Sequence, residues 1–324
     1  MKTGLKITAF AAALAGAFGT AYGVGQTFDP VVAERPPAHE ERHPSGAGES
    51  EHGGTAAAQA PGGLQISEGG YTLDLDTPAV TAGERAELLR FTVRDADGRA
   101  VDEYRREHDK ELHLIVASRD LVTYRHLHPE RAPDGTWSTP VDLPRAGGYR
   151  VFADFTPDRP GAENLTLGAD LAASGPYSPR ELPRPSATAR VDGYDVKLTG
   201  ALTPGRAGEL RLTVSRDGKP VTDLQPYLGA YGHLVALRAG DLAYLHVHPE
   251  GEPGDGTTRP GPHVSFTATA PSGGSYRLFL DFKHDGVVRT AAFTVEAGKA
   301  TPEKPASTSP GHTESPGHSD GHGH

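Results

Sequence analysis

Two stretches of this chain repeat each other, and this internal repeat restricts the fold more than any other feature of the sequence. The segment LHLIVASRDLVTYRHLHPE at 112–130 aligns without a gap with GHLVALRAGDLAYLHVHPE at 232–250. Further along, GGYRVFADF at 147–155 aligns with GSYRLFLDF at 274–282, after a longer loop in the second copy. A repeat of this kind predicts two copies of one structural module.

Each copy contains short runs of β-branched, aromatic and Leu residues, which are separated by turn pairs such as Asp97-Gly98 and Asp217-Gly218. Frequent turn signals with almost no helical periodicity are typical of β-sandwiches. The Gly-x-Tyr sequences that end at Tyr149 and Tyr276 resemble a tyrosine corner. We therefore predict an all-β chain: two tandem immunoglobulin-like antiparallel β-sandwich domains with disordered N- and C-terminal tails. We also expect Trp137, Tyr124 and Tyr244 in the core.

Composition divides the chain further. Lys2 and Lys6 flank the start of an uncharged run of small apolar residues, which predicts a signal peptide or a retained membrane anchor. Stretches of Pro, Gly, Ala and His without periodicity predict disorder. The expected order is a signal peptide or anchor at 1–25, a tether at 26–63, the first sandwich at 64–175, a Pro-rich joint at 176–185, the second sandwich at 186–297 and a His-rich tail at 298–324. We expect a secreted or cell-envelope protein whose only membrane contact is its N-terminal segment.

The residue types that are missing limit the chemistry. The chain has no Cys and a single Met, but it has 16 His residues. Without Cys there are no disulfides and no thiolate ligands, so a bound metal must be held by nitrogen and oxygen. The net charge of −10 argues against nucleic-acid binding, which depends on Lys and Arg at the phosphates.

The histidines of the repeat fall where two paired strands would bring them together. If 112–117 and 122–128 pair across a loop from Ser118 to Leu121, His113 lies opposite His126, and His128 shares their face. This register also sets Ile115 opposite Tyr124 and Ala117 opposite Val122. In the second copy it sets His233 opposite His246, with His248 beside them.

Three imidazoles on one face suit a metal such as Zn or Cu, whose nitrogen ligands lie about 2.0–2.1 Å from the ion. We therefore predict one three-histidine metal site per copy. Asp154 and Asp281 occupy equivalent positions and are candidate further ligands, although strand parity points them away from the core and equally fits a hydrogen-bonding role. His108 precedes the first motif and has no counterpart in the second. The alternative is a purely structural corner of His, Tyr and Pro.

The phrase HDKELHLIVASRDLVTYRHLHPE, followed by GTWSTPVDLPRAGGYRVFADF, resembles a module of exported bacterial proteins of actinobacterial type that are described as secreted or heavy-metal-binding. The resemblance covers both repeats. The resemblance implies that His108, His113, His126 and His128 belong to the functional site. The second repeat departs from the pattern, because Tyr227-Leu228 stand where His108 would be expected. If one site is real, we expect the first.

These observations favour a non-enzymatic, extracytoplasmic metal-binding protein. Cu(II) is the first choice, because imidazole sites favour it in the Irving–Williams order, and Zn(II) is the second. The role would be buffering, sequestration or delivery to a membrane metal transporter, with metal affinity falling as the pH drops through about 6.5. The alternative is a structural or adhesive immunoglobulin-like envelope protein with no metal role. No nucleophile setting, phosphate loop or general base argues for an enzyme.

Overall fold

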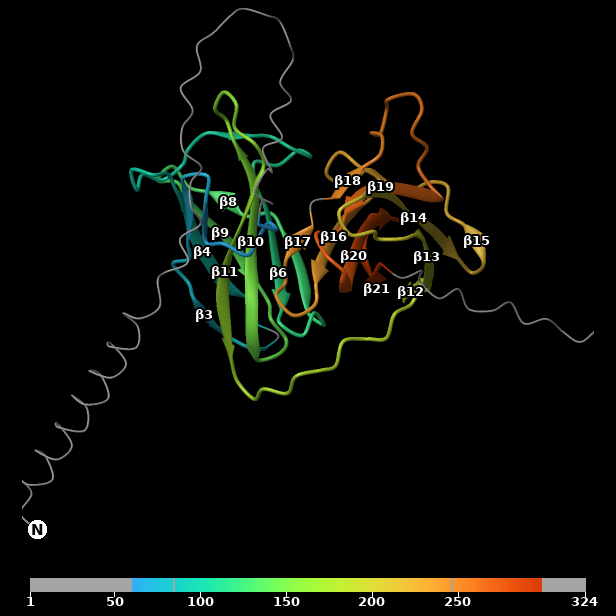
Figure 1. The fold of residues 1–324 in the computed structure, drawn as a ribbon, viewed down its shortest axis with the longest axis horizontal. Helices are drawn as coiled ribbons and strands as arrows, with labels where there is room; N and C mark the ends of the chain where they lie inside the picture. Colours follow the sequence, from blue (N-terminus) through green and yellow to red (C-terminus); the bar gives the residue numbers. More distant parts are fainter. Residues whose placement is uncertain (1–59, 84, 246, 299–324) are drawn as a thin grey trace, which may run out of the picture. The chain divides into compact units, whose positions relative to one another are not determined.

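The computed structural model describes residues 60–83, 85–245 and 247–298, and only the backbone of His248. The predicted signal peptide or anchor, nearly all of the predicted tether and the predicted tail after Gly298 lie outside these residues. In the described part, all regular structure is β-strand (Figure 1). That part also holds no helix with the length and apolar character to cross a bilayer.

The first module is a sandwich of two sheets. One sheet has the order β1-β2-β4-β9-β8, and the other has the order β3-β11-β10-β6-β7, with β5 paired to β10. The strands are β1 (Ser67–Glu68), β2 (Tyr71–Asp74), β3 (Ala79–Thr81), β4 (Glu87–Arg94), β5 (Tyr104–Arg105), β6 (His113–Ser118), β7 (Tyr124–Leu127), β8 (Glu130–Arg131), β9 (Thr136–Val141), β10 (Gly147–Pro157) and β11 (Leu165–Ser174).

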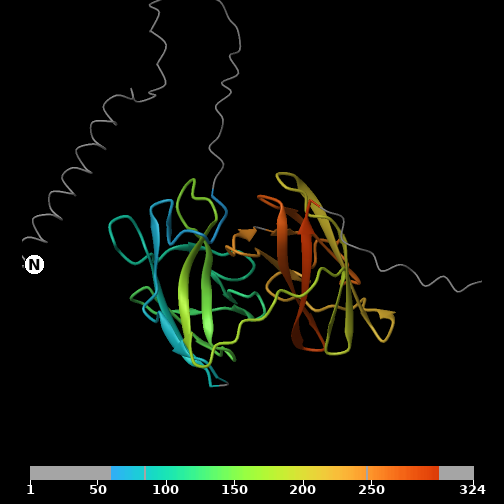
Figure 2. The ribbon, with the colours of Figure 1, turned by 60° about the horizontal axis from the view of Figure 1, so that its bottom comes forward.

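The second module repeats this plan with fewer strands. Its sheets have the orders β12-β13-β14-β19-β18, with β15 paired to β14, and β17-β16-β20-β21 (Figure 2). The strands are β12 (Thr188–Val191), β13 (Tyr194–Gly200), β14 (Ala207–Arg216), β15 (Lys219–Pro220), β16 (His233–Arg238), β17 (Tyr244–Leu245), β18 (Val247–Pro249), β19 (His263–Thr269), β20 (Gly274–His284) and β21 (Val287–Ala297).

The predicted tandem immunoglobulin-like sandwich fold is confirmed, with one departure from antiparallel pairing. Strand β3 pairs with β11 in parallel, through Ala79 and Ala172 and the pairs that follow them. Each sandwich encloses its own core of buried Leu, Val, Phe and Tyr side chains. Trp137 lies in the first core, as predicted, where its ring stacks on Phe91 and meets Tyr104 edge-on.

The predicted register of the histidine hairpin was wrong by two residues. Ile115 pairs with His126, and Ala117 pairs with Tyr124. The turn is wider than predicted, because the Ser118 amide donates to the Thr123 carbonyl and the Ser118 hydroxyl accepts from the Thr123 amide. Because a slip of two residues preserves the face, His113, His126 and His128 still gather on one side of the sheet.

The second copy shows the same shift. Ala236 pairs with Leu245, and Leu237 pairs with Tyr244. The predicted partnership of His233 with His246 does not fit this register, although His246 itself lies outside the described residues. The agreement between the copies indicates that the turn geometry was duplicated with the sequence.

A third buried cluster joins the two sandwiches, which fall within one compact unit of the chain. In β6, Leu114 and Val116 point into their own core, whereas Ile115 and Ala117 belong to this shared cluster. The Tyr124 ring stacks on Phe279 with centroids 4.1 Å apart. The equivalent Tyr244 contacts Phe152, 5.7 Å between centroids. The two repeats therefore exchange equivalent contacts across an approximately isologous interface.

The end of the predicted disordered tether is ordered. Gly63 donates its amide to the Thr166 carbonyl in β11, and the Gly62 carbonyl accepts from the Tyr244 amide in β17. A Cβ on Gly63, which has φ +73, would lie 2.4 Å from the Phe152 ring. This short segment is thus bonded to both sandwiches, and glycine is required where it passes over Phe152.

Both predicted tyrosine corners are present. The Tyr149 hydroxyl donates to the Arg145 carbonyl at 2.7 Å, and the Tyr276 hydroxyl donates to the Ser272 carbonyl at 2.9 Å. Each ring is almost fully buried. The hydroxyl of each tyrosine thus ties the start of a long strand to the loop before it.

We expect Tyr149→Phe and Tyr276→Phe each to lower the free energy of unfolding by about 1 kcal/mol, because each removes one hydrogen bond and leaves a carbonyl without its partner. Urea unfolding followed by circular dichroism measures this. Tyr177→Phe is the control, since Tyr177 is 60% exposed. Equal stability of all three variants and the wild type would contradict the assignment.

Candidate metal centre

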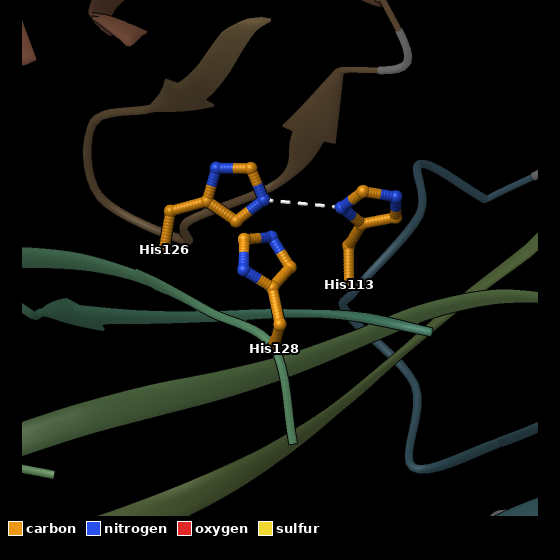
Figure 3. Close-up of side chains that lie close together, drawn as sticks. All are labelled: His113, His126 and His128. Atoms are coloured by element: carbon orange, nitrogen blue, oxygen red, sulfur yellow. Dashed lines mark hydrogen bonds between the residues drawn. The ribbon is translucent and has the colours of Figure 1, made fainter. Parts of the chain in front are cut away.

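Three histidines of the first module lie together at one end of the β6–β7 hairpin (Figure 3). His113 begins β6, His126 lies in β7, and His128 follows the end of β7. The ring centroids of His113 and His126 are 5.4 Å apart, those of His113 and His128 5.5 Å, and those of His126 and His128 4.8 Å. One nitrogen from each ring lies within 4.8 Å of the other two. The sequence prediction that these three residues come together is therefore supported by their positions.

His126 is oriented by a carboxylate from the other module. Its Nδ1 lies 2.9 Å from Oδ2 of Asp281 in β20, and both side chains are almost fully buried. The Thr290 hydroxyl donates to the other oxygen of Asp281 at 2.5 Å. Since a carboxylate accepts, the proton of neutral His126 lies on Nδ1, and its Nε2 is left as a lone pair. A carboxylate behind a histidine is a frequent device for fixing metal ligands.

The tautomer of His113 is also fixed by an acceptor, which lies at its Nε2 rather than at its Nδ1. Its Nε2 lies 3.2 Å from the Glu107 carbonyl, which can only accept, so the proton lies on Nε2 and Nδ1 carries a lone pair. That Nδ1 faces His126 Nε2 at 3.1 Å, the dashed contact in Figure 3. In the neutral protein two lone pairs thus point at each other. They are stabilised when a cation, either a proton or a metal ion, lies between them.

The position of His128 favours a metal ion over a shared proton. Its Nε2 is buried and has no hydrogen-bond partner in the described structure. A proton shared by His113 and His126 would leave this nitrogen unsatisfied, at a cost of about 1–3 kcal/mol. A metal ion ligated by all three rings satisfies every free nitrogen. Two nitrogens bound to one tetrahedral ion about 2.0 Å away lie roughly 3.3 Å apart, which is close to the His113–His126 distance.

Burial favours the neutral form of two of these imidazoles. Loss of hydration, together with the neighbouring histidines, lowers the pKa of His113 to about 4 and that of His128 to about 3. Burial also lowers the pKa of His233 to about 4. Metal ligation requires neutral imidazole, so these residues are available as ligands well below the pH of about 6.5 at which an ordinary histidine becomes protonated.

His233 of the second copy lies beside this cluster. The His233 ring centroid lies 6.2 Å from that of His113 and 6.0 Å from that of His126. Its Nε2 donates to the Tyr227 carbonyl at 2.7 Å, as His113 Nε2 does to Glu107. The predicted partners of His233 are His246 and His248. His246 and the side chain of His248 lie outside the described part of the structure. The separate second site thus stays a prediction.

His108 lies at the rim of this cluster. It is exposed, and its ring centroid is 5.3 Å from that of His233 and 6.2 Å from that of His113. A pocket of about 110 Å³, lined by both sandwiches and including His108 and Lys110, leads to the histidines. His108 stands at the entrance, and the structure does not include it in the group of three ligand nitrogens.

The two candidate aspartates play different parts. Both point away from the core of their own sandwich, as strand parity predicted, but toward the other sandwich rather than solvent. Asp154 accepts from the Asn164 amide at 2.7 Å and bonds to the Tyr244 hydroxyl. Asp281 holds His126, so its position fits an orienting role and not direct ligation. The apolar character of β6 and β16 on both faces was the available signal that these sheets are covered on both sides.

These features define a class: a tandem immunoglobulin-like β-sandwich protein with a buried histidine cluster where its two modules meet. The chain belongs to the family described as a domain of unknown function, DUF8832, whose model matches residues 65–163 and 189–299. No curated protein matches the sequence. The two matches coincide with the two repeats.

Solved structures that match this chain include invasin, intimin and an S-layer protein. Invasin, a bacterial integrin-binding protein, is 13% identical over 70% of this chain with a TM-score of 0.20, and the chain spans 39% of its length. The D0-D1 domain of intimin is 12% identical over 69% of this chain and 96% of its own, with a TM-score of 0.20. Domains 4 and 5 of the S-layer protein SbsC are 13% identical over 72% and 98%, with a TM-score of 0.21. At such low scores these likenesses carry no argument about function, and none of the descriptions names a metal.

The lowered histidine pKa values make the metal-free protein sensitive to acid. Between pH 6.5 and about 4, His113, His128 and His233 are protonated in the unfolded chain but remain neutral in the folded chain. The free energy of unfolding therefore falls as the pH falls. We expect a loss of roughly 3–5 kcal/mol between pH 7 and 5 from the three residues together. Urea unfolding at several pH values measures it. The slope should be shallower in His128→Leu, and a stability that does not change with pH would contradict the assignment.

Proposed function

We propose that this protein binds a divalent transition metal through His113, His126 and His128. The observation that carries the proposal is a set of three nitrogens: two facing lone pairs 3.1 Å apart, and a third, buried nitrogen that has no partner among the described residues. No ordinary hydrogen-bonding scheme satisfies all three, whereas one cation does. The all-nitrogen ligand set favours Cu(II), with Zn(II) second.

The protein acts outside the cytoplasm in this proposal. Support comes from the sequence of residues 1–25, which has the charged start and small apolar run of an export signal or anchor. Neutral, buried ligands next to a narrow pocket suit holding a metal for buffering, sequestration or transfer to a membrane transporter. We propose a binding role without catalysis.

The second candidate is a structural or adhesive envelope module without a metal role. It rests on the immunoglobulin-like fold, which serves many binding and structural proteins and by itself specifies none of them. In that case the histidine cluster would be a hydrogen-bonded element of the interface between modules. The two candidates differ in whether removing the histidines changes metal binding.

Calorimetric titration of the full chain with Cu(II) and Zn(II) separates them. We expect a tight site in the wild type that loses at least about 100-fold in affinity in His113→Ala and in His126→Ala, because each variant removes one ligand. Since the tails also hold histidines, the matched control is His263→Ala, which removes an exposed histidine bonded to Thr213. Equal affinity in all four proteins would overturn the proposal and favour the adhesive module.

A second test uses His128, whose Nε2 has no hydrogen-bond partner among the described residues of the metal-free protein. We expect His128→Leu to raise the free energy of unfolding of the metal-free protein by about 1 kcal/mol or more, because it replaces a buried unpaired nitrogen with an apolar group. The same variant should lose the stabilisation that the metal gives to the wild type. Thermal unfolding with and without Zn(II) measures both effects. A destabilised metal-free variant that still gains stability from Zn(II) would contradict the assignment.

A further inference from the structure

The residues around the proposed ligands come from both modules. The first module supplies His113, His126 and His128, whereas the second supplies Asp281 behind His126 and His233 beside His113. Asp281 and His233 are neighbours across the ladder of β16 and β20. This pair is therefore part of the wall that the second module presents to the first module's hairpin.

The tautomer of His233 suits a ligand that binds through Nδ1. The Tyr227 carbonyl takes the proton on its Nε2 at 2.7 Å, which leaves Nδ1 as a lone pair, as Glu107 does for His113. The residue is only 8% exposed. No hydrogen bond to His233 Nδ1 occurs among the described residues, and the rings of His108, His113 and His126 surround it within 6.2 Å between centroids. A fourth imidazole with a lone pair thus lies beside the ligand candidates, although its nitrogen is outside the group of three that lie within 4.8 Å of one another.

We propose that His233 is the fourth ligand of the metal, and that the ion therefore links the two modules and stabilises their docking. This inference rests on the proposed three-histidine site and adds its completion from the second module. Metal binding and module docking then favour each other: an ion that binds only the docked arrangement stabilises it by its own binding free energy. Asp281 is a positioning residue that reaches the metal only through His126.

The number of coordinated nitrogens tests the ligand assignment directly. In the full chain with one equivalent of Cu(II), electron paramagnetic resonance should show four nitrogen ligands for the wild type and three for His233→Ala. Affinity should fall at least about 10- to 100-fold in the variant. His233→Gln is the second variant, because its amide can keep the bond to the Tyr227 carbonyl while removing the imidazole. His263→Ala, in the same module, should behave as the wild type.

Hydrogen exchange tests the link between modules. Adding Zn(II) should slow amide exchange in β6–β7 and in β16–β17 of the wild type, and it should protect only β6–β7 in His233→Gln. Asp281→Asn should keep four nitrogens in the copper spectrum but bind roughly 10- to 100-fold more weakly, since it removes only the charge behind His126.

The outcomes separate the two proposals. If the wild type binds no metal beyond the tail histidines, the proposed function fails and this inference with it. If the wild type binds tightly with three nitrogens, and both His233 variants match its affinity and exchange, the first-module site stands and the link between modules is wrong. Four nitrogens that fall to three in both His233 variants, with loss of protection in β16–β17, establish the link.

Discussion

The packing of one sandwich against the other is the constraint on which the rest of this structure depends. Sheets that bury one face in their own core bury the other face against the partner module, through Ile115, Ala117 and Tyr124 on one side and Leu237 and Phe279 on the other. That apolar contact excludes water from the strand ends beside it. Loss of hydration lowers the pKa of His113 and His128 there, and carbonyl and carboxylate acceptors fix the tautomers of His113 and His126. Among the described residues, Nε2 of His128 is left without a partner.

The two copies share their packing contacts across the interface but differ in a polar residue beside it. The packing contacts are exchanged evenly, Tyr124 with Phe279 and Tyr244 with Phe152. The polar residues are not exchanged evenly, because His108 of the first copy is replaced by Leu228 in the second, although both adopt positive φ in equivalent turns. Duplication thus preserved the backbone and the apolar contacts, whereas the histidine at 108 has no counterpart in the second copy.

Sequence reasoning reached the fold and the first three histidines because both depend on local patterns. Turn pairs and alternating apolar residues locate strands, and the two-residue period places His113, His126 and His128 on one face even with the register wrong by two. It could not place His233 and Asp281 beside them, because that contact depends on how two modules dock, and no local pattern encodes the partner of an outward face. The wide turn at Ser118 was missed for a similar reason: it depends on a side-chain hydroxyl that accepts from the Thr123 amide. Only the continuous apolar run of β6 signalled that its second face is covered.

The glycine segment at 62–63 has a mechanical consequence. Its backbone is bonded to Thr166 in one sandwich and to Tyr244 in the other, and it crosses the Phe152 ring with no room for a side chain. Tension applied to the chain ahead of residue 60 therefore reaches both modules at once, as shear along backbone hydrogen bonds, before it reaches either core. A pull from that end would therefore load the contact between the modules as well as the first sandwich.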